Sequence, residues 1–498
     1  FNLFIFIEIT SLATNSLIGF EDRESLLTAG FKYVIATSLA STFVLLGTAF
    51  IYNQTGTLNI DDIIAKQALI RGPVGQVALI LLLTSLLIEL KPYPANGWGL
   101  DVYETAPASV AAMISVGVSA GVLFALYKVL PLFSDFLTSI AVVGGITFLV
   151  SNVIGLRQDN VKRLLGYSSI GQVGLLAMAL ALLQQDGQHA YLAMIVGGLF
   201  LNHLLAKAGL FWLAGVVQRE HITAWSALAG KPWVLLVFGV LLAALIGLPP
   251  FPGFWAKWGL VLELAADSRY GWIALILVGS LLEAAYLFRW FGHALRADES
   301  AAVPVNAAAL MPSALAAVLL TVSGYFTAKH AGVVPLQLFL PLYAAAAMFL
   351  LDALPGRIKS LLMLAVVAAG GAWVAGDLEG LNRIFALILV AGSVLVAVAT
   401  LYRDDARKGF FPLMTGLLLS LATLLTARTS LEFFFSWELM TLSSYLLVTL
   451  GRRGVRPGLI YLLFSLGSAY FILAGFAVAY GATGSTLLAD LGNSGNVT

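Results

Sequence analysis

Ionisable side chains inside long apolar stretches are the residues of this sequence that could do chemistry. Eight of them fall in or at the ends of such stretches: Glu8, Lys32, Glu89, His203, Lys207, Lys257, Glu283 and Glu438. Within a bilayer an ionisable side chain costs ~2.5–3.5 kcal/mol on insertion scales, so it normally faces a protein interior or a wet cavity. Such groups mark routes for protons or ions, and the sequence therefore predicts charge movement through the interior.

Some of these residues have a purely structural alternative. Lys32 lies near the start of its stretch, where its ammonium can extend to the lipid headgroups. Glu89 and Lys91 flank the end of another stretch, where they would form an interfacial ion pair. For Glu283 we favour pairing with Arg289 over a role in transport.

Spacing favours a functional interpretation at two other positions. His203 and Lys207 are four residues apart and share one helix face. A lone buried histidine is more often a packing residue, but a lysine beside it in mid-span indicates a polar axis. Glu8 shares its face with Ser11 and Asn15, whose polar groups can support a chain of water molecules.

Two apolar stretches are interrupted by proline and glycine. Residues 233–266 contain GLPPFPGFWAKWGL, and residues 87–98 read LIELKPYPANGW. Because proline lacks a backbone donor, the helix must break at both places, which lipid tolerates only where the freed carbonyls face protein or water. Paired interruptions of this kind point to the central site of a transporter. Lys257 follows the second break by about a turn and would project its ammonium into it.

Composition places these stretches in a membrane. Hydrophobic residues make up 60% of the 498 residues, charged residues 11%, and the mean hydropathy is +0.94, which together indicate a polytopic membrane protein. Without cysteine, the chain can form no disulfide, thiolate zinc site or cysteine-held iron–sulfur cluster, so it carries no redox site of that kind. The net charge of +1 argues against nucleic-acid binding. No signal peptide is visible in the opening FNLFIFIEIT.

Hydropathy predicts an all-α protein with sixteen membrane spans. Their positions are 1–20, 30–52, 73–90, 108–130, 135–156, 162–184, 188–215, 233–266, 271–291, 305–326, 335–353, 359–375, 382–401, 409–427, 431–450 and 457–481. Loops after odd-numbered spans hold 17 Lys and Arg residues and loops after even-numbered spans hold 7. Since cytoplasmic loops are enriched in positive charge, residue 1 is expected on the non-cytoplasmic side.

A long internal repeat links the two ends of the sequence. The segments FIFIEITSLATNSLIGF and FKYVIATSLASTFVLLGTAFIYNQTGTLNIDD recur as FFSWELMTLSSYLLVTL and LIYLLFSLGSAYFILAGFAVAYGATGSTLLAD. Glu8 corresponds to Glu438 with an offset of 430, and the Thr-Gly-Thr/Ser turns correspond with an offset of 428. Four spans precede the helix of Glu438 and none precedes that of Glu8, so we expect a fragment of a duplicated protein.

Several motifs, taken in order, resemble a known family. EITSLATNSLIGF, WGLDVYETAP, QDNVKRLLGYSSIGQVG, NHLLAKAGLFWLAG and LPPFPGFWAKW are similar to segments of the antiporter-like subunits of respiratory complex I, Mrp-type cation/proton antiporters and membrane-bound hydrogenases. The resemblance covers about residues 1–300 and resumes at 430–490. It implies inverted five-helix repeats, each with one broken helix, around a polar axis.

The resemblance also assigns roles to individual residues. It implies that Glu8 is the essential glutamate of the fifth helix, that His203 and Lys207 fit the HAxxKAxLF pattern, and that Lys257 is the lysine of the second broken helix. The family's lysine of the first broken helix falls on Glu89, with Lys91 two residues beyond and roughly 200° around a helix.

Two further positions depart from the family pattern. Where many relatives carry a central lysine in the next span, the sequence offers Ser119 or Ala120. The second unit has Ile460 where the first has Lys32. The departures predict that the first unit conducts differently or is partly structural.

These expectations define a domain organisation and three candidate functions. Residues 1–330 would form a first antiporter-like unit without about its first four helices, and 331–498 would begin a second with about six. The leading hypothesis is a proton- or sodium-translocating subunit of a complex I-like or hydrogenase-like complex in a bacterial or archaeal inner membrane. Its partners would be other membrane subunits, including antiporter-like ones, with iron–sulfur or other redox cofactors in the partners and none in this chain. The alternatives are a redox-free Mrp-type antiporter subunit and an inactive scaffold.

Overall fold

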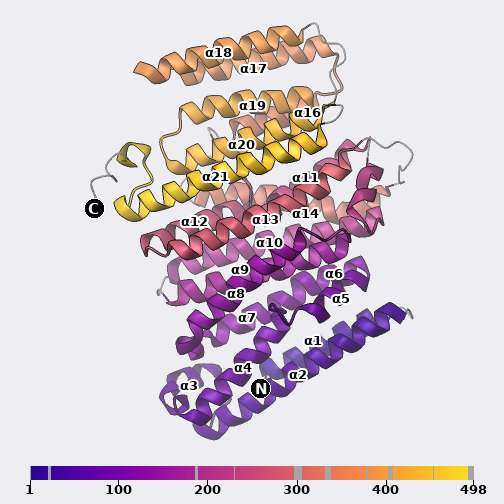
Figure 1. Ribbon diagram of the computed structural model, residues 1–498, viewed down its shortest axis with the longest axis vertical. Helices are drawn as coiled ribbons and strands as arrows, with labels where there is room; N and C mark the ends of the chain where they lie inside the picture. Colours follow the sequence, from indigo (N-terminus) through magenta and orange to yellow (C-terminus); the bar gives the residue numbers. More distant parts are fainter. Residues whose placement is uncertain are drawn as a thin grey trace. The chain divides into compact units, whose positions relative to one another are not determined.

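The structure, a computed structural model, is helical almost throughout (Figure 1). It describes residues 2–20, 24–185, 189–228, 230–296, 305–330, 338–376, 380–401, 408–451 and 454–491. Within these ranges the only β-structure is two isolated bridges, Asn160 with His221 and Thr429 with Leu487. The predicted all-α fold is confirmed.

The helices belong to two compact units, which are described separately. The first comprises Phe1–Ile246, Val278–Trp290 and Ala297–Thr321, and the second comprises Gly247–Leu277, Phe291–Arg296 and Val322–Thr498. The predicted division into antiporter-like units at residues 330 and 331 follows sequence similarity rather than compactness, and it stays a prediction.

The first unit contains α1 to α11. Their bounds are α1 (Asn2–Ile18), α2 (Glu24–Thr55), α3 (Ile60–Ala65), α4 (Pro73–Leu90), α5 (Gly97–Thr105), α6 (Ala108–Met113), α7 (Ser119–Val129), α8 (Leu137–Gly155), α9 (Val161–Gln185), α10 (His189–Val217) and α11 (Pro232–Ile246). A π-helical segment, Ile114–Val118, joins α6 to α7.

The second unit contains most of the remaining helices. Their bounds are α12 (Pro252–Ala266), α16 (Leu340–Leu350), α17 (Gly356–Gly376), α18 (Gly380–Thr400), α19 (Phe410–Leu425), α20 (Ser430–Thr449) and α21 (Val455–Thr483). Residues of α13 (Tyr270–Ala294) and α14 (Ala307–His330) are divided between the units. A capping box starts α20, because Thr429 accepts from the Glu432 backbone and the Glu432 side chain accepts from the Thr429 backbone.

Ten helical stretches of the described chain are long and apolar enough to cross a membrane. Four shorter apolar helices accompany them: Asn2–Ile18, Pro232–Ile246, Leu340–Leu350 and Phe410–Leu425. The predicted number of sixteen spans is not confirmed. Part of the difference arises because Ala108–Gly155 is one continuous helical stretch of 48 residues, where the sequence predicted two spans.

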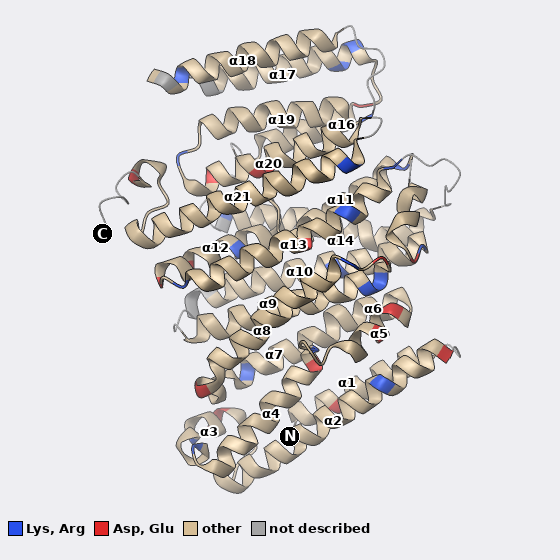
Figure 2. Cartoon of the chain, in the orientation of Figure 1, with Lys and Arg blue, Asp and Glu red and all other residues tan. Residues whose placement is uncertain are grey.

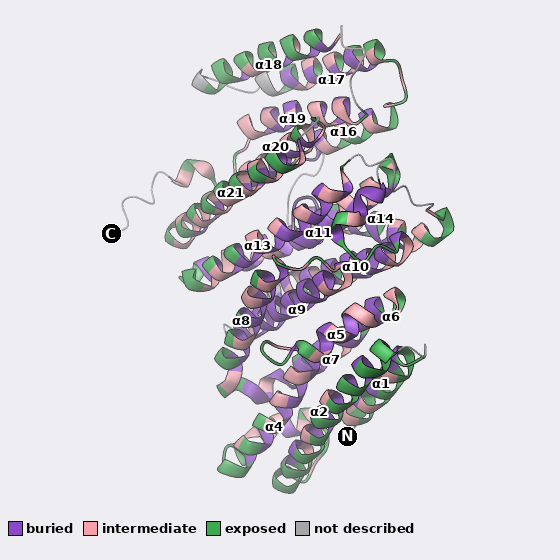
Figure 3. Ribbon diagram, turned by 45° about the vertical axis from the view of Figure 1, so that its right-hand side comes forward, coloured by how far each residue is buried: buried purple, intermediate pink, exposed green. Residues whose placement is uncertain are grey.

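Helix α9 is the centre of the first unit. It is buried continuously from Leu164 to Leu183, and Figure 3 shows it almost entirely in the colour of buried residues. Its closest neighbour is α8. A Cβ atom at Gly174 would lie 2.7 Å from the Gly144 carbonyl oxygen, and one at Gly144 would lie 2.6 Å from the Gly174 carbonyl oxygen. Small residues therefore let the two backbones touch, as is usual between membrane helices.

Both predicted helix interruptions are present. Helix α4 ends at Leu90 and α5 begins at Gly97, while α11 ends at Ile246 and α12 begins at Pro252. Charged residues are sparse along the helices (Figure 2). The few that lie next to the breaks are therefore candidates for a functional site.

The contact between α8 and α9 predicts a specific sensitivity. Gly174→Ala is expected to lower the free energy of unfolding by ~1–3 kcal/mol, because the new methyl group overlaps a backbone carbonyl that cannot move independently. Thermal unfolding in detergent measures the change. Gly197→Ala in α10 is the matched control, since no atom lies within 4 Å of its added Cβ. Equal midpoints for the two variants would contradict the close contact.

Candidate functional site

A buried carboxylate at the end of α4 lies near a second one from α1. Glu89 is 2% exposed, and its Oε1 has no hydrogen-bond partner in the described chain. Its charge interacts with that of Glu8, which is half-buried. The Tyr33 hydroxyl of α2 lies near Ser11 and Thr14 of α1 and near Glu89, and it has no hydrogen-bond partner in the described chain. The predicted polar face of Glu8 therefore meets Glu89, and together they offer oxygens to a proton, a cation or water.

Lys91 fills the first helix break. It is the C-terminal cap of α4 with φ at +59°, and it is 2% exposed. Its Nζ donates to the Glu89 backbone oxygen at 3.1 Å and lies 5.4 Å from the centre of the Trp98 ring. A Cβ at Gly99 would come within 2.6 Å of its side chain. The predicted angle of 200° from Glu89 assumes a continuous helix, whereas α4 ends at Leu90 and Lys91 has a left-handed backbone at the start of the break.

Lys32 belongs to a separate charge network. Its Nζ lies 2.5 Å from Asp101 Oδ2, and its side chain is 49% exposed. Arg163 of α9 contacts Asp101 at 3.1 Å and Glu104 at 2.6 Å. Burial of Asp101 raises its pKa, but the hydrogen bonds from Lys32 and Arg163 outweigh this effect and the pKa lies below its ordinary value. Asp101 lies in α5, between predicted spans, so this network ties α2 and α9 to α5.

His203 and Lys207 lie inside the first unit on α10. His203 is 1% exposed, and its Nε2 lies 3.4 Å from the Ser115 backbone oxygen. Lys207 is fully buried, and its Nζ donates to the Leu165 carbonyl at 3.3 Å. The charge of Lys207 also interacts with that of Glu283 on α13. The predicted shared face of His203 and Lys207 therefore points to the interior.

Glu283 is a buried polar residue whose setting the sequence did not reveal. Its carboxylate is fully buried and accepts from Ser168 at 2.6 Å and from Gln172 at 2.5 Å, both on α9. The favoured pairing with Arg289 is wrong, because Arg289 donates to the Gln158 carbonyl and pairs with Asp159 at 3.4 Å. The mid-span position of Glu283 was the available signal, and its partners lie more than a hundred residues away in sequence.

The π-helical segment Ile114–Val118 ends directly before Ser119 and Ala120, the positions where the resemblance implied a lysine in many relatives. Ser115 is fully buried, and its Oγ lies 2.7 Å from Ser169 Oγ on α9. Ser119 donates to the Ile114 carbonyl at 3.2 Å. Wide helical turns of this kind are frequent at functional sites because they free backbone carbonyls. Here the Ser115 carbonyl faces His203.

Lys257 lies against the second helix break. Gly247 has φ at +86°, and a Cβ there would lie 3.1 Å from both Cδ and Nζ of Lys257. The Trp255 indole donates to the Pro250 carbonyl at 2.9 Å, which fixes the start of α12. The half-buried lysine therefore folds back over the break, as the sequence predicted.

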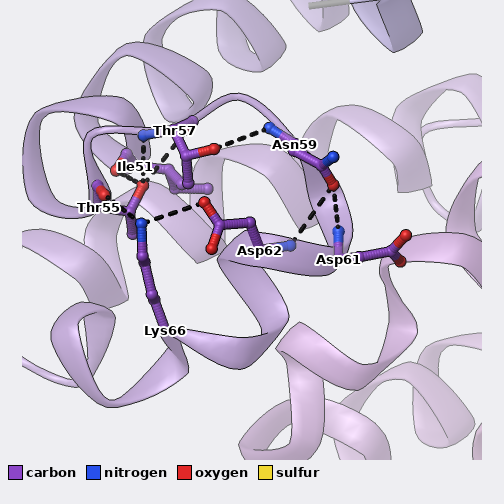
Figure 4. Close-up of polar contacts among 7 residues, drawn as sticks. All are labelled: Ile51, Thr55, Thr57, Asn59, Asp61, Asp62 and Lys66. Carbon is purple, nitrogen blue, oxygen red and sulfur yellow. Dashed lines mark hydrogen bonds and ion pairs between the residues drawn. The ribbon is translucent and has the colours of Figure 1, made fainter.

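The turn after α2 is the first copy of the repeated motif, and Figure 4 shows its contacts. Thr55 donates to the Ile51 carbonyl at 2.8 Å and accepts from the Thr57 backbone at 3.4 Å. Asn59 caps α3, accepting from the Asp61 and Asp62 backbones. A hydrogen bond from Lys66 lowers the pKa of Asp62, with a further contribution from Thr57.

The turn after α21 repeats this geometry in the second unit. Thr483 donates to the Ala479 carbonyl at 2.8 Å and accepts from the Ser485 backbone at 3.2 Å. Ser485 in turn donates to Asp490 at 2.5 Å. The central glycines have φ values of +68° at Gly56 and +67° at Gly484. The two segments that the sequence aligned thus adopt the same local structure.

The structure brings only some predicted site residues together. Glu8, Glu89 and Lys91 form one cluster, and His203 and Lys207 form another with Glu283. Glu438 in the second unit is 2% exposed, and neither of its carboxylate oxygens has a hydrogen-bond partner in the described chain. Their role in ion translocation stays a prediction.

Long apolar helices, two of them interrupted next to buried ionisable groups, define the class of all-α polytopic membrane proteins. Residues 1–283 match the family described as NADH:quinone oxidoreductase/Mrp antiporter, TM, and the chain belongs to this family.

A curated relative and two solved structures illustrate the similarity. NADH-quinone oxidoreductase subunit N of Desulforudis audaxviator is 33% identical over 302 residues, which is 58% of this chain and 59% of the relative. A chain of the archaeal membrane-bound sulfane sulfur reductase is 30% identical with a TM-score of 0.61, covering 66% of this chain and 69% of that one. A chain of respiratory complex I from Thermus thermophilus is 29% identical with a TM-score of 0.53, covering 64% of this chain and 72% of that one. The chain thus spans less than two thirds of the curated relative's length.

The packing of Lys257 on Gly247 predicts a coupled effect on stability. Gly247→Ala combines the strain of a left-handed alanine, ~1–2 kcal/mol, with overlap against the lysine. Gly230→Ala is the matched control, because its φ is +78° and no atom lies within 4 Å of the added Cβ. We expect Gly247→Ala to unfold at a lower temperature than Gly230→Ala. When Lys257 is also replaced by alanine, the two glycine substitutions should lower the unfolding temperature by the same amount. If Gly247→Ala has the same effect with and without Lys257, the contact is contradicted.

Proposed function

We propose that the chain is an ion-translocating, antiporter-like subunit of a complex I-like or hydrogenase-like membrane complex, moving protons or sodium ions. The observation that carries the proposal is the placement of Lys91 and Lys257 in the two helix breaks. A break supplies free carbonyls inside the membrane, and a lysine beside it can bind and release a proton. The relatives named above are subunits of multi-subunit respiratory complexes, which supports the assignment.

The proposed roles follow the two clusters of the first unit. Glu8 acts as a switchable charge partner of Glu89 and Lys91, because the three charges interact at the first break. Lys207 and His203 act as relay groups inside the unit. Lys257 acts as the terminal donor toward one membrane face. Lys32 contributes through Asp101, at the surface end of the route.

The partners and cofactors in this proposal lie outside the chain. Other membrane subunits, including further antiporter-like ones, would contact it, and iron–sulfur or other redox cofactors in partner subunits would supply the driving force. The complex would reside in a bacterial or archaeal inner membrane, with residue 1 on the non-cytoplasmic side. The distribution of positive charge among the predicted loops supports this orientation.

We also propose that residues 331–498 begin a second antiporter-like unit. The matching turns after α2 and α21 support this, as does the correspondence of Glu8 with the buried Glu438.

Substitutions at the buried charges test the proposed function. Glu8→Gln and Lys257→Ala in the intact complex are expected to slow ion translocation at least about tenfold, since positioned proton-transfer groups typically contribute ~10²–10⁴-fold. Translocation into inverted membrane vesicles measures the effect. Glu24→Gln and Lys128→Ala remove exposed charges of the same types and serve as controls. Full translocation by both buried-charge variants would overturn the proposal.

The composition of the purified assembly tests the choice of complex. Co-purified iron–sulfur or nickel–iron subunits are expected, and metal analysis together with mass spectrometry of the subunits detects them. An assembly with antiporter-like subunits and no redox metal would instead favour the Mrp-type function.

A further inference from the structure

Glu283 is a buried carboxyl group that accepts two side-chain hydrogen bonds. Ser168 and Gln172 donate to different oxygens of its carboxylate, at 2.6 and 2.5 Å. Both donors are on α9, whose middle is buried on all sides, and the carboxylate is itself fully buried. Ser168 and Gln172 are uncharged, so their hydrogen bonds stabilise an ionised Glu283 without neutralising it, and a third partner of opposite charge can do so.

Lys207 is that third partner across the interior. Its ammonium is fully buried and donates to the Leu165 carbonyl at 3.3 Å. The Leu165 carbonyl and Ser168, which donates to Glu283, are three residues apart on α9, so both charges lie beside the same helix face and interact without a direct ion pair in the described chain. Tyr286, one turn further along α13, also interacts with the Glu283 charge and donates to Asn152 at 2.8 Å. Because proton transfer needs hydrogen-bond distance or one bridging water, exchange between these two groups would pass through a water molecule or follow a side-chain movement that brings them together.

We propose that Glu283 is a proton-exchanging partner of Lys207, so that α10 and α13 together carry the relay of the first unit. This inference rests on the proposed function and adds a residue to it. In the transfer, an N–H bond of the Lys207 ammonium breaks and an O–H bond forms on Glu283. The products are a neutral amine and a neutral carboxylic acid, and the net charge of the pair is unchanged. Ser168 and Gln172 are positioning residues that hold the acceptor oxygens.

A purely structural pair makes different predictions. If Glu283 only compensates the charge of Lys207, its carboxylate never changes protonation, and reaction-induced difference spectra contain no carboxylic acid band from it. If it exchanges a proton, that band appears during the reaction. Glu283→Gln identifies the band by its absence, because the amide is of nearly the same size and retains an acceptor oxygen but cannot ionise.

The experiment uses the complete membrane complex. Glu283→Gln is expected to lower ion translocation at least about tenfold, as for other positioned proton-transfer groups. Glu283→Asp, which keeps the acid, is expected to retain a measurable part of the rate. Reaction-induced infrared difference spectra should contain a carboxylic acid band that is absent in Glu283→Gln and shifted in Glu283→Asp. Ser313→Ala is the control, since it removes a buried hydroxyl that donates to the Gly209 carbonyl on α10.

The outcomes separate this inference from the proposed function. Unchanged translocation and an unchanged infrared band in Glu283→Gln, alongside loss of translocation in Glu8→Gln, would overturn the role of Glu283 alone. Full translocation in Glu8→Gln and Lys257→Ala would overturn the function itself. If Glu283→Gln fails to assemble, Glu283→Asp decides, because an unshifted band and a full rate contradict the proposal.

Discussion

Compensation of buried charge is the constraint on which the first unit depends. A charge removed from water needs hydrogen bonds and an opposite charge to remain ionised. Glu283 draws its two donors from α9, and Lys207 on α10 draws its acceptor from the same helix. These polar contacts fix α9 in the middle of the unit, and its glycine contact with α8 lets it lie there closely packed.

Interrupted backbone provides much of this compensation. A helix that stops releases its last carbonyls, and Lys91 uses the one at Glu89. The π-helical turn likewise releases the Ser115 carbonyl toward His203. At the second break, Gly247 has no side chain and therefore leaves room for the Lys257 side chain to pack against the backbone. The helix breaks and the buried charges therefore depend on each other. Hydrocarbon excludes water, so backbone groups freed at the breaks take the place of water around the charged side chains.

Sequence predicted the features that depend on local residue type. Proline and glycine located both helix breaks, and the spacing of four placed His203 and Lys207 on one buried face. The failures concern features that local spacing does not encode. A left-handed backbone at Lys91 is rare for a side chain of its kind, so a helical angle was assumed. The partners of Glu283 come from α9, 111 and 115 positions away, whereas Arg289 was simply the nearest cation in sequence.

The repeat shows the same division between local and distant determinants. Each turn is closed by hydrogen bonds within a few residues, so two copies with the same short motif fold alike regardless of their surroundings. The charge pattern is not copied, because Lys32 meets Asp101 whereas Ile460 is half-exposed and apolar. Turn geometry therefore follows from the shared motif and is not evidence of common activity. For the second copy, activity must be argued from Glu438, a buried carboxyl group neither of whose oxygens has a hydrogen-bond partner in the described chain.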